Sequence, residues 1–342
     1  MMVANTLHGA ALYQRRALST ADIPGWQQFL SRFERADPSS INYYPEEFLE
    51  DVLDGRLDPR CDTVGVFSKS ILVAYAIVRA KTTDEGVFQL DLEGCVDPRH
   101  RRRGLGTELL RWSVARALQR RSQVAHRRSA IMRAWALEEN IELRALLDRA
   151  GLAPTRWWYD IYGRLDEMPP LQKPPLPEGL QLVPLGNDHM SALRGVHNGV
   201  FEGQSEDGAM SSLRWEKEII SDSSLQRDLS YLVVDAAGSI ASYIITFASE
   251  EDAKATGERE LHIRYVGTPR RWRGLNLFKY LIATVEEGAR EQKYDSLVFS
   301  VDSENPTGAL RIFEHAGMFD WDRDYWECWI CHSRTLSVGD PG

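Results

Sequence analysis

The sequence predicts two consecutive α/β domains, each built around a mixed, mainly antiparallel sheet. The chain has 342 residues, of which 43% are hydrophobic and 27% charged, and this is enough apolar material for two cores. A proline-rich segment at 166–178 lies almost at the middle of the chain. Proline at that density prevents a helix or a central strand and favours an extended connector. We therefore predict an N-terminal domain at 1–165, a linker at 166–178 and a C-terminal domain at 179–335.

The two halves also resemble each other, which is the second reason to expect two domains of one fold. Glycine and asparagine residues recur in the same order in both halves, 165 to 170 positions apart. A duplicated domain with small loop insertions produces such an ordered series. The matched pairs are Gly104 and Gly274, Asn140 and Asn305, and Gly151 and Gly317.

In the first half, runs rich in β-branched residues alternate with stretches of helical spacing. A helix is expected after Ser19, a residue type that caps helices. Strands are expected at 13–17, 63–67, 71–79, in a run ending at Val96, and at 130–136. A long helix at 104–121 is predicted by apolar residues at helical spacing, namely Leu105, Leu109, Leu110, Val114 and Leu118. A further helix and an aromatic-rich strand close the half.

The second half repeats this order. The turn at 235–238 joins two apolar runs and predicts an antiparallel strand pair. Strands are expected at 180–184, 231–234, 240–247, in a run ending at Val266, and at 296–301. Helices are expected after Asn187 and at 274–292, and an aromatic-rich strand again closes the unit.

The loop after Val96 has the features of an anion-binding site. The strand enters an Arg/Gly turn and passes directly into an amphipathic helix, whose first N–H groups lack acceptors within the helix. Such a helix start binds anions, and glycines there let a phosphate approach the backbone. The turn lacks the Gly-Lys-Ser/Thr ending of a Walker loop and the GxGxxG pattern of dinucleotide folds. The residues concerned are Arg101, Arg102, Arg103, Gly104, Gly106 and Thr107.

This loop resembles the R/Q-x-x-G-x-G/A signature of the GNAT acetyltransferases, through Arg101, Gly104 and Gly106. The segment 139–152 is similar to the asparagine-to-glycine helix that follows in that family. The second half repeats both features, and the doubled layout resembles the tandem GNAT group that includes mycothiol synthase. The resemblance implies two tandem acyl-CoA N-acyltransferase domains with acetyl-CoA as the cofactor.

Carried onto this sequence, the resemblance also implies a set of CoA-binding residues in each half. Backbone N–H groups of the loop would hold the pyrophosphate, the strand end would pair with the pantetheine arm, and an asparagine would contact the arm near the sulfur. In the first half these residues are Cys95, Val96, Arg101, Arg102, Arg103, Gly104, Leu105, Gly106, Thr107 and Asn140. In the second half they are Val266, Arg271, Arg273, Gly274, Leu275, Asn276 and Asn305.

Two departures from the family pattern affect function. Asn276 stands where the loop requires a small residue, and its side chain adds bulk beside the expected phosphate. Many family members have a tyrosine four residues before the late glycine, which protonates the leaving thiolate. Leu147 and Phe313 occupy these positions, and neither can donate a proton.

Four residues are candidate catalytic groups, each with a structural alternative. Glu93 faces the same side of its strand as Cys95 and is the first candidate base, although it could simply balance Arg79. His262 could act as a base near neutral pH, or it could simply lie on the solvent-exposed face of its strand. Tyr159 and Tyr325 each follow a late glycine by eight residues, and each could be an acid or a core aromatic residue.

Composition excludes several other classes of function. A net charge of −9 argues against nucleic acid as a partner. The sequence has no metal-ligand cluster, no apolar stretch long enough for a membrane span and no export signal. Its four cysteines, Cys61, Cys95, Cys328 and Cys331, are expected to be reduced thiols.

We expect a cytoplasmic monomer or homodimer that acetylates a small-molecule amine. The alternative is a CoA-binding sensor whose active sites have decayed.

Overall fold

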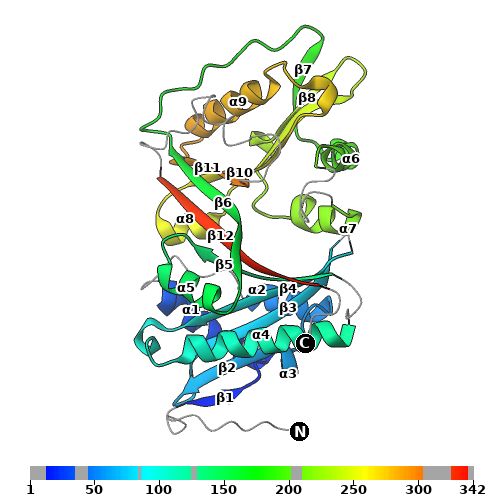
Figure 1. Cartoon of the computed structure of the whole chain (residues 1–342). Coiled ribbons are helices and arrows are strands. Elements are labelled where there is room, and N and C mark those ends of the chain that lie inside the picture. Colours follow the sequence, from blue (N-terminus) through cyan, green and yellow to red (C-terminus); the bar gives the residue numbers. More distant parts are fainter. Residues whose placement is uncertain are drawn as a thin grey trace. The chain divides into compact units, whose positions relative to one another are not determined.

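The computed structural model describes residues 13–34, 45–83, 86–124, 129–201, 210–302 and 325–337, and every structural statement below concerns these residues (Figure 1). The chain divides into two compact units. Unit 1 comprises Met1–Arg156 together with Trp329–Gly342, and unit 2 comprises Trp157–Cys328.

Unit 1 is built on a sheet with the strand order β1-β2-β3-β4-β5-β12. Every neighbouring pair is antiparallel except β4 and β5, which are parallel. The central strand β3 is apolar and buried along most of its length, as its sequence ILVAYAIV predicts. The strands are β1 (Gln14–Arg16), β2 (Thr63–Ser68), β3 (Ile71–Thr82), β4 (Phe88–Val96), β5 (Ala130–Leu137) and β12 (Tyr325–Leu336).

Helices pack on both faces of this sheet. One face of β3 presents Tyr75 and Ile77 to α1, and the other presents Ala74 and Ala76 to α4. The alternation follows from the two-residue repeat of a strand. The helices are α1 (Ile23–Glu34), α2 (Pro45–Leu53), α3 (Pro59–Asp62), α4 (Leu105–Val124) and α5 (Ile141–Arg149), with short 3-10 turns η1 (Thr20–Asp22) and η3 (Pro98–His100).

Unit 2 repeats this plan with the strand order β6-β11-β10-β9-β8-β7, in which only β10 and β11 are parallel. Its strands are β6 (Ala153–Arg164), β7 (Leu180–Pro184), β8 (Tyr231–Asp235), β9 (Ile240–Phe247), β10 (Glu260–Gly267) and β11 (Ser296–Asp302). Its helices are α6 (Met190–Val200), α7 (Ser212–Trp215), α8 (Glu250–Thr256) and α9 (Leu277–Glu291). Shorter helical turns are η4 (Asn187–His189), η5 (Glu216–Ile220), η6 (Arg227–Leu229) and η7 (Arg270–Trp272).

The closing strands are exchanged between the two halves of the sequence. Residues 158–164 of β6 pair with β11 of unit 2, whereas residues 329–336 of β12 pair with β5 of unit 1. The boundary between the two compact units falls inside β6, after Arg156, whereas the sequence predicts a linker at 166–178. The sequence identifies an aromatic-rich strand but not its partner, because β5 and β11 are equivalent strands of a repeated fold and offer similar edges.

The proline-rich segment belongs to unit 2, where it is extended and attached to α9. The Arg290 guanidinium donates to the carbonyl oxygens of Leu165 and Met168, and the Leu171 N–H donates to Glu286 Oε2 at 3.3 Å. Lys173 also pairs with Glu287 at 2.8 Å. The segment is therefore held by side chains of one helix.

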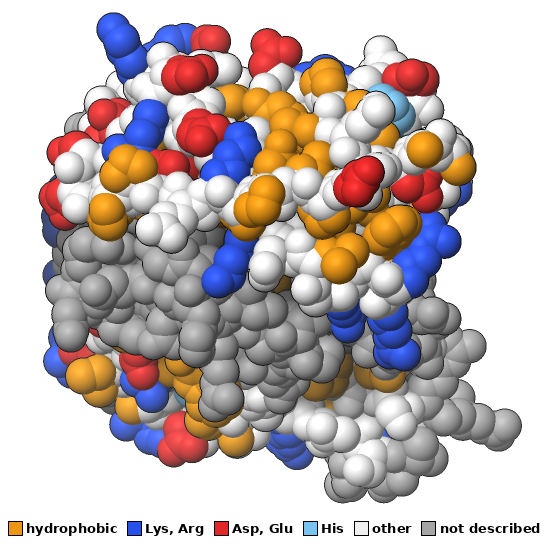
Figure 2. Space-filling view, turned by 90° about the horizontal axis from the view of Figure 1, so that it is seen from above, with side chains coloured by type: hydrophobic (Ala, Val, Ile, Leu, Met, Phe, Trp, Pro, Cys, Tyr) orange, Lys and Arg blue, Asp and Glu red, His pale blue; other side chains and the backbone are white. Residues whose placement is uncertain are grey.

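Figure 2 shows the molecule from above, from the side of unit 2 along which this green segment runs in Figure 1. Acidic and basic side chains are intermixed across the described part of this face, and hydrophobic side chains gather near its middle. A nucleic-acid backbone is recognised by a continuous basic surface, which the described part of this face does not present.

The buried His332 of unit 1 makes stability depend on pH. Its side chain is 2% exposed and its Nδ1 lies 3.3 Å from the Leu152 carbonyl oxygen. Burial lowers the pKa of His332 below its usual value. The unfolded chain therefore takes up a proton near pH 6.5 that the folded chain resists, so the stabilisation is present above that pH and is lost as the pH falls through the lowered pKa.

We expect the variant His332→Leu to have a flatter stability profile than the wild type between pH 7.5 and 5. The difference in slope should reach at most about 1.4 kcal/mol per pH unit, the value for one proton. Urea unfolding at several pH values measures it, and parallel profiles would contradict the assignment.

Candidate functional site

The candidate site lies where the parallel strands β4 and β5 separate. Their pairing covers Phe88–Asp91 against Ala130–Arg133 and then ends. β4 nevertheless continues to Val96, and β5 continues to Leu137. Because the strands diverge, backbone groups and side chains beyond Asp91 face an opening in the sheet.

A cavity of about 310 Å³ occupies this opening. Along β4 it is lined by Glu93 and Cys95, on the face covered by α1, and by Leu92 and Val96, on the face covered by α4. A single cavity can contact residues on both faces of one strand only where the cavity passes through the sheet between two strands. The remaining lining residues are Phe33, Tyr75, Ala76, Gly94, Arg101, Arg102, Gly104, Leu105, Gly106, Thr107, Leu109, Leu110, Ser113, Ala134, Trp135, Asn140, Glu142, Leu143, Leu146, Leu147 and Arg149.

One end of the cavity is the beginning of helix α4. Gly104 has φ +81°, and the first helical hydrogen bond runs from the Glu108 N–H to the Gly104 carbonyl oxygen at 3.0 Å. Amides at a helix start lack acceptors within the helix, and here Gly104, Leu105, Gly106 and Thr107 all line the cavity. The arrangement can bind an anion through backbone N–H groups.

The three loop arginines take different directions. The Arg101 guanidinium lies 5.3 Å from the centre of the Phe33 ring, and Arg102 pairs with Glu142 of α5 at 2.5 Å. Both residues line the cavity. Arg103 donates to the Tyr13 hydroxyl at 3.1 Å and is not one of the lining residues.

Asn140 caps α5 and lines the same cavity. Its Oδ1 accepts a hydrogen bond from the Leu143 N–H at 3.1 Å, which satisfies one of the first amides of the helix. Leu147 on this helix is buried and also lines the cavity. The wall at this position therefore offers no proton donor.

Glu93 belongs to a network of charges on the α1 side of the sheet. Arg79 of β3 donates to Glu93 Oε1 at 2.8 Å and pairs with Asp51 of α2 at 3.5 Å. Burial disfavours the charged form of Arg79, but Glu93, Asp91 and Asp51 outweigh it and raise the pKa of Arg79 above its usual value.

A second ion pair continues the network on the neighbouring strand. Arg133 of β5 pairs with Asp91 of β4 at 2.9 Å. Burial opposes ionisation of this carboxyl, but Arg133 and then Arg79 outweigh it and lower the pKa of Asp91. Glu93 lines the cavity, whereas Asp51 and Asp91 do not.

Residues 26–146 match the family model described as acetyltransferase (GNAT) family. Residues 26–146 therefore form a GNAT acetyltransferase domain. Members of this family are acetyltransferases, and the chain is accordingly an acyltransferase. A comparison with curated proteins finds no matching relative.

Solved structures extend the fold assignment to the whole chain. A GCN5-related N-acetyltransferase from Sphaerobacter thermophilus aligns with a TM-score of 0.69 at 22% identity, covering 96% of this chain and 97% of that one. A tandem GNAT protein from the clavulanic acid biosynthesis pathway aligns with a TM-score of 0.65 at 16% identity, covering 96% and 100%. N-myristoyltransferase of Saccharomyces cerevisiae with bound myristoyl-CoA aligns at 0.56 and 12%, covering 97% and 81%. At identities this low, structural similarity establishes the fold alone. The predicted tandem GNAT fold is confirmed.

The second GNAT loop differs in backbone shape from the first. In unit 2 the first helical hydrogen bond runs from Tyr280 to the carbonyl oxygen of Asn276, two residues later than at the matched position in unit 1. Asn276 has φ +57° and caps α9, and Leu275 is 41% exposed whereas its counterpart Leu105 is 3% exposed. The backbone amides of the second loop are therefore arranged differently from the matching amides that line the cavity in unit 1.

The other predicted residues of the second loop are partly engaged elsewhere. The Arg273 guanidinium donates to the Thr268 carbonyl oxygen at 3.2 Å, and that of Arg271 lies 5.6 Å from the Trp272 ring centre. β10 and β11 separate after Ile263 and Phe299, so Val266 lies beyond their last pair. Asn305 and Phe313 lie outside the described residues.

The described residues that line the unit 1 cavity do not include His262 or Tyr159. His262 lies 3.2 Å from Glu260 with 43% of its side chain exposed, within the paired part of β10. Tyr159 pairs with Val301 in unit 2, and its ring packs on Trp326 at 6.0 Å. Tyr325 begins β12, and its side chain lies outside those described.

Sequence reasoning missed the aromatic wall of the cavity and considered Arg79 only as a balancing charge. Phe33, Tyr75 and Trp135 come from three separate elements, and nothing in their local sequence indicates that they meet. Arg79 could have been noticed in the sequence, because it is a charged residue in the otherwise apolar run of β3.

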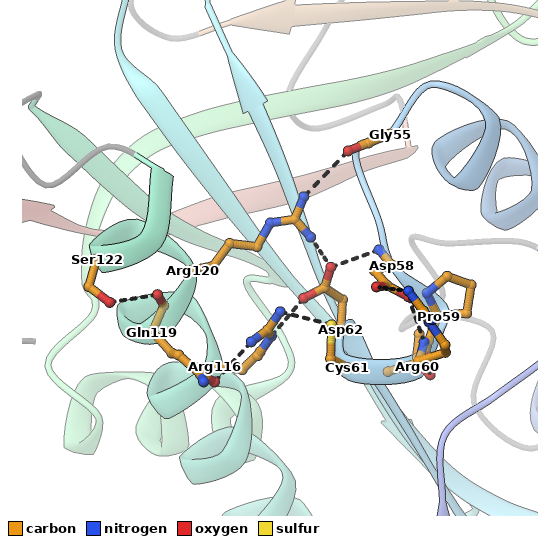
Figure 3. A network of polar contacts seen from close by, with 11 residues as sticks. Gly55, Asp58, Pro59, Arg60, Cys61, Asp62, Arg116, Gln119, Arg120 and Ser122 are labelled. Atoms are coloured by element: carbon orange, nitrogen blue, oxygen red, sulfur yellow. Dashed lines mark hydrogen bonds and ion pairs between the residues drawn. The ribbon is translucent and has the colours of Figure 1, made fainter.

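The basic cluster on α4 serves the structure of unit 1 (Figure 3). Asp62 is fully buried and accepts from Arg116 Nε at 2.7 Å and from Arg120 Nη1. Arg116 also donates to the exposed Cys61 thiol at 3.0 Å. These arginines are therefore paired within the unit.

We expect Asp62→Asn to destabilise the protein by about 3 kcal/mol, because it leaves two largely buried guanidinium groups without their carboxylate. Urea unfolding measures the loss. Asp58→Asn, which removes an exposed partner of Arg60, is the matched control and should destabilise the protein far less than Asp62→Asn. Equal effects would contradict the structural role.

The two cysteines with CxxC spacing are buried core thiols. Cys328 lies in unit 2 and Cys331 in unit 1, and burial raises the pKa of Cys331 to about 11. Among the described residues, no three His, Cys, Asp or Glu side chains are grouped to hold a metal ion. Nor does the described part of the chain contain a helix that is both long and apolar enough to span a membrane.

Proposed function

We propose that this chain transfers the acetyl group of acetyl-CoA directly to the primary amine of a small molecule, with unit 1 as the catalytic unit. The supporting observation is that one cavity joins the anion-binding start of α4 to the opening between β4 and β5. A CoA thioester needs both, because its pyrophosphate is anionic and its pantetheine arm carries amides that can pair with strand backbone. We place the enzyme in the cytoplasm, as a monomer or homodimer.

The residues of unit 1 would divide the work as follows. The amides from Gly104 to Thr107, assisted by Arg101 and Arg102, hold the pyrophosphate. The backbone of Cys95 and Val96 pairs with the arm, and Asn140 contacts it near the sulfur. Catalysis then rests on positioning the amine and polarising the thioester carbonyl.

Glu93 is the proposed base. The amine nitrogen bonds to the carbonyl carbon while the C–S bond breaks and its electron pair stays on sulfur. An ammonium acceptor loses two protons to solvent, one of them through Glu93, and the CoA thiolate takes up one, so that one proton is released overall. With leucine at 147, we assign protonation of the thiolate (thiol pKa about 8.5) to solvent.

We assign no catalytic role to unit 2. Asn276 has a side chain and a left-handed backbone conformation, whereas Gly106 at the matched position of the first loop lies inside a regular helix. The second-loop residues predicted to bind CoA, and His262, would then be structural.

The second candidate function is a CoA-binding protein without turnover. Leu147 favours it, because the cavity wall lacks a proton donor where many family members have tyrosine. The two functions share the CoA site and differ only in the chemistry that follows binding.

A turnover assay tests the proposal. Purified protein is incubated with acetyl-CoA and a panel of primary amines, and free thiol is measured. Amine-dependent release of CoA supports the enzyme, and parallel reactions with butyryl-CoA and myristoyl-CoA test the acyl group. Tight CoA binding with no release above hydrolysis would favour the second candidate, and no binding would overturn both.

A further inference from the structure

Arg79 connects Glu93, which lines the cavity, to helix α2. Its guanidinium contacts Glu93 Oε1 through Nη2 at 2.8 Å and Asp51 through Nη1 at 3.5 Å. Asp51 is 2% exposed on α2 and is also paired with Arg56 at 3.2 Å. The planar guanidinium fork can hold two carboxylates at fixed directions, which a lysine ammonium cannot do.

From this geometry we propose that Arg79 is the positioning residue of the acyl transfer, holding Glu93 ionised and oriented beside the opening between β4 and β5. The inference rests on the proposed function of unit 1. Arg79 itself does not line the cavity, so it acts through Glu93. Asp51 anchors the arginine from α2, so that a base on β4 is fixed relative to the helix that covers it.

The charges around Glu93 fix the direction of the pH effect. Glu93 pairs with Arg79 on β3, which is joined through Asp51 on α2 to Arg56. Asp91 lies two residues earlier on the same strand and pairs with Arg133 on β5, and Arg101 lines the same cavity as Glu93. Removing the positive charge of Arg79 leaves Glu93 beside two other carboxylates, which favours its protonated and inactive form. The acid limb of the pH–rate profile must then move to higher pH.

The test compares Arg79→Met and Arg79→Lys with Arg133→Met. Arg133 is the matched control, because its guanidinium is similarly buried but pairs with Asp91, which lies outside the cavity. For Arg79→Met we expect kcat/KM for the amine to fall about 100-fold at neutral pH, the acid limb to shift upward, and CoA affinity to stay within about twofold. Arg79→Lys should recover part of the rate and of the pH profile, and Arg133→Met should leave the acid limb unchanged.

Several outcomes would overturn the inference. One is an unchanged pH profile for Arg79→Met, and another is the same shift in Arg133→Met. A double-mutant cycle of Arg79→Met and Glu93→Gln on the urea unfolding midpoint provides a readout without turnover, and additive shifts would show that the two side chains are not coupled. Failure of the wild type to bind CoA or release thiol would instead refute the proposed function, and the positioning role with it.

Discussion

Replacing Gly104 with valine is expected to weaken CoA binding by about 100-fold or more. Gly104 has φ +81°, a conformation that a β-branched residue adopts only at a cost of about 1–2 kcal/mol. The loop would relax away from its present shape, and the amides from Gly104 to Thr107 would no longer converge on the cavity. Loss of one or two hydrogen bonds to a charged phosphate accounts for an effect of this size. Calorimetric titration with CoA measures it.

The second GNAT domain supplies a matched control for this substitution. Gly274 has φ +82°, and a Cβ atom there, as at Gly104, would have no neighbour within 4 Å. Gly274→Val therefore imposes the same backbone strain on the equivalent loop. We expect it to leave CoA affinity within about twofold of the wild type, because α9 begins two residues later and Asn276 interrupts the amide array. If Gly274→Val abolished binding and Gly104→Val did not, the CoA site would have to be moved to unit 2.

The first loop could be predicted from sequence because its chemistry is local. Arg101, Gly104 and Gly106 lie within six residues, and their spacing alone indicates a helix start with exposed amides. The structure adds that nine of the ten residues proposed for CoA in this half, including Cys95, Val96 and Asn140, line one cavity together with Glu93. Asn276 was predictable only in part. Its bulk was visible in the sequence, but its left-handed conformation and the later start of α9 were not.

Features that depend on contacts between distant residues could not be predicted from the sequence. Arg79 and Asp51 are 28 positions apart and meet Glu93 only because β3, β4 and α2 pack together. The partners of the closing strands were equally hidden, since the repeat gives β5 and β11 interchangeable edges. Tyr159 illustrates the consequence. It was proposed as an acid for the first domain from its distance to Gly151, yet strand pairing places it in unit 2.

Ending the chain after Cys328 is expected to unfold unit 1, although the deleted part of that unit lies far along the sequence from its other residues. The deletion removes Trp329–Leu336, which pair residue by residue with β5. It also removes Ile330, Cys331 and Leu336, each at most 3% exposed, and leaves the edge of a central parallel strand unpaired. Burial of each such side chain contributes about 1.5–3 kcal/mol, so the total loss is comparable with the whole stability of a domain, about 5–15 kcal/mol.

The control for this deletion is a chain that ends after Ser337, which keeps all of β12. It should unfold cooperatively at the wild-type temperature and bind CoA normally, whereas the shorter chain should lose CoA binding and the near-ultraviolet circular dichroism of unit 1. The pairing of β6 with β11 does not involve the deleted residues, so unit 2 is expected to keep its sheet when the chain is shortened. Hydrogen exchange should therefore protect β8 to β11 and not β2 to β5 in the shorter chain. Retained CoA binding would mean that β5 does not need β12, and that the exchange of closing strands has no part in forming the site.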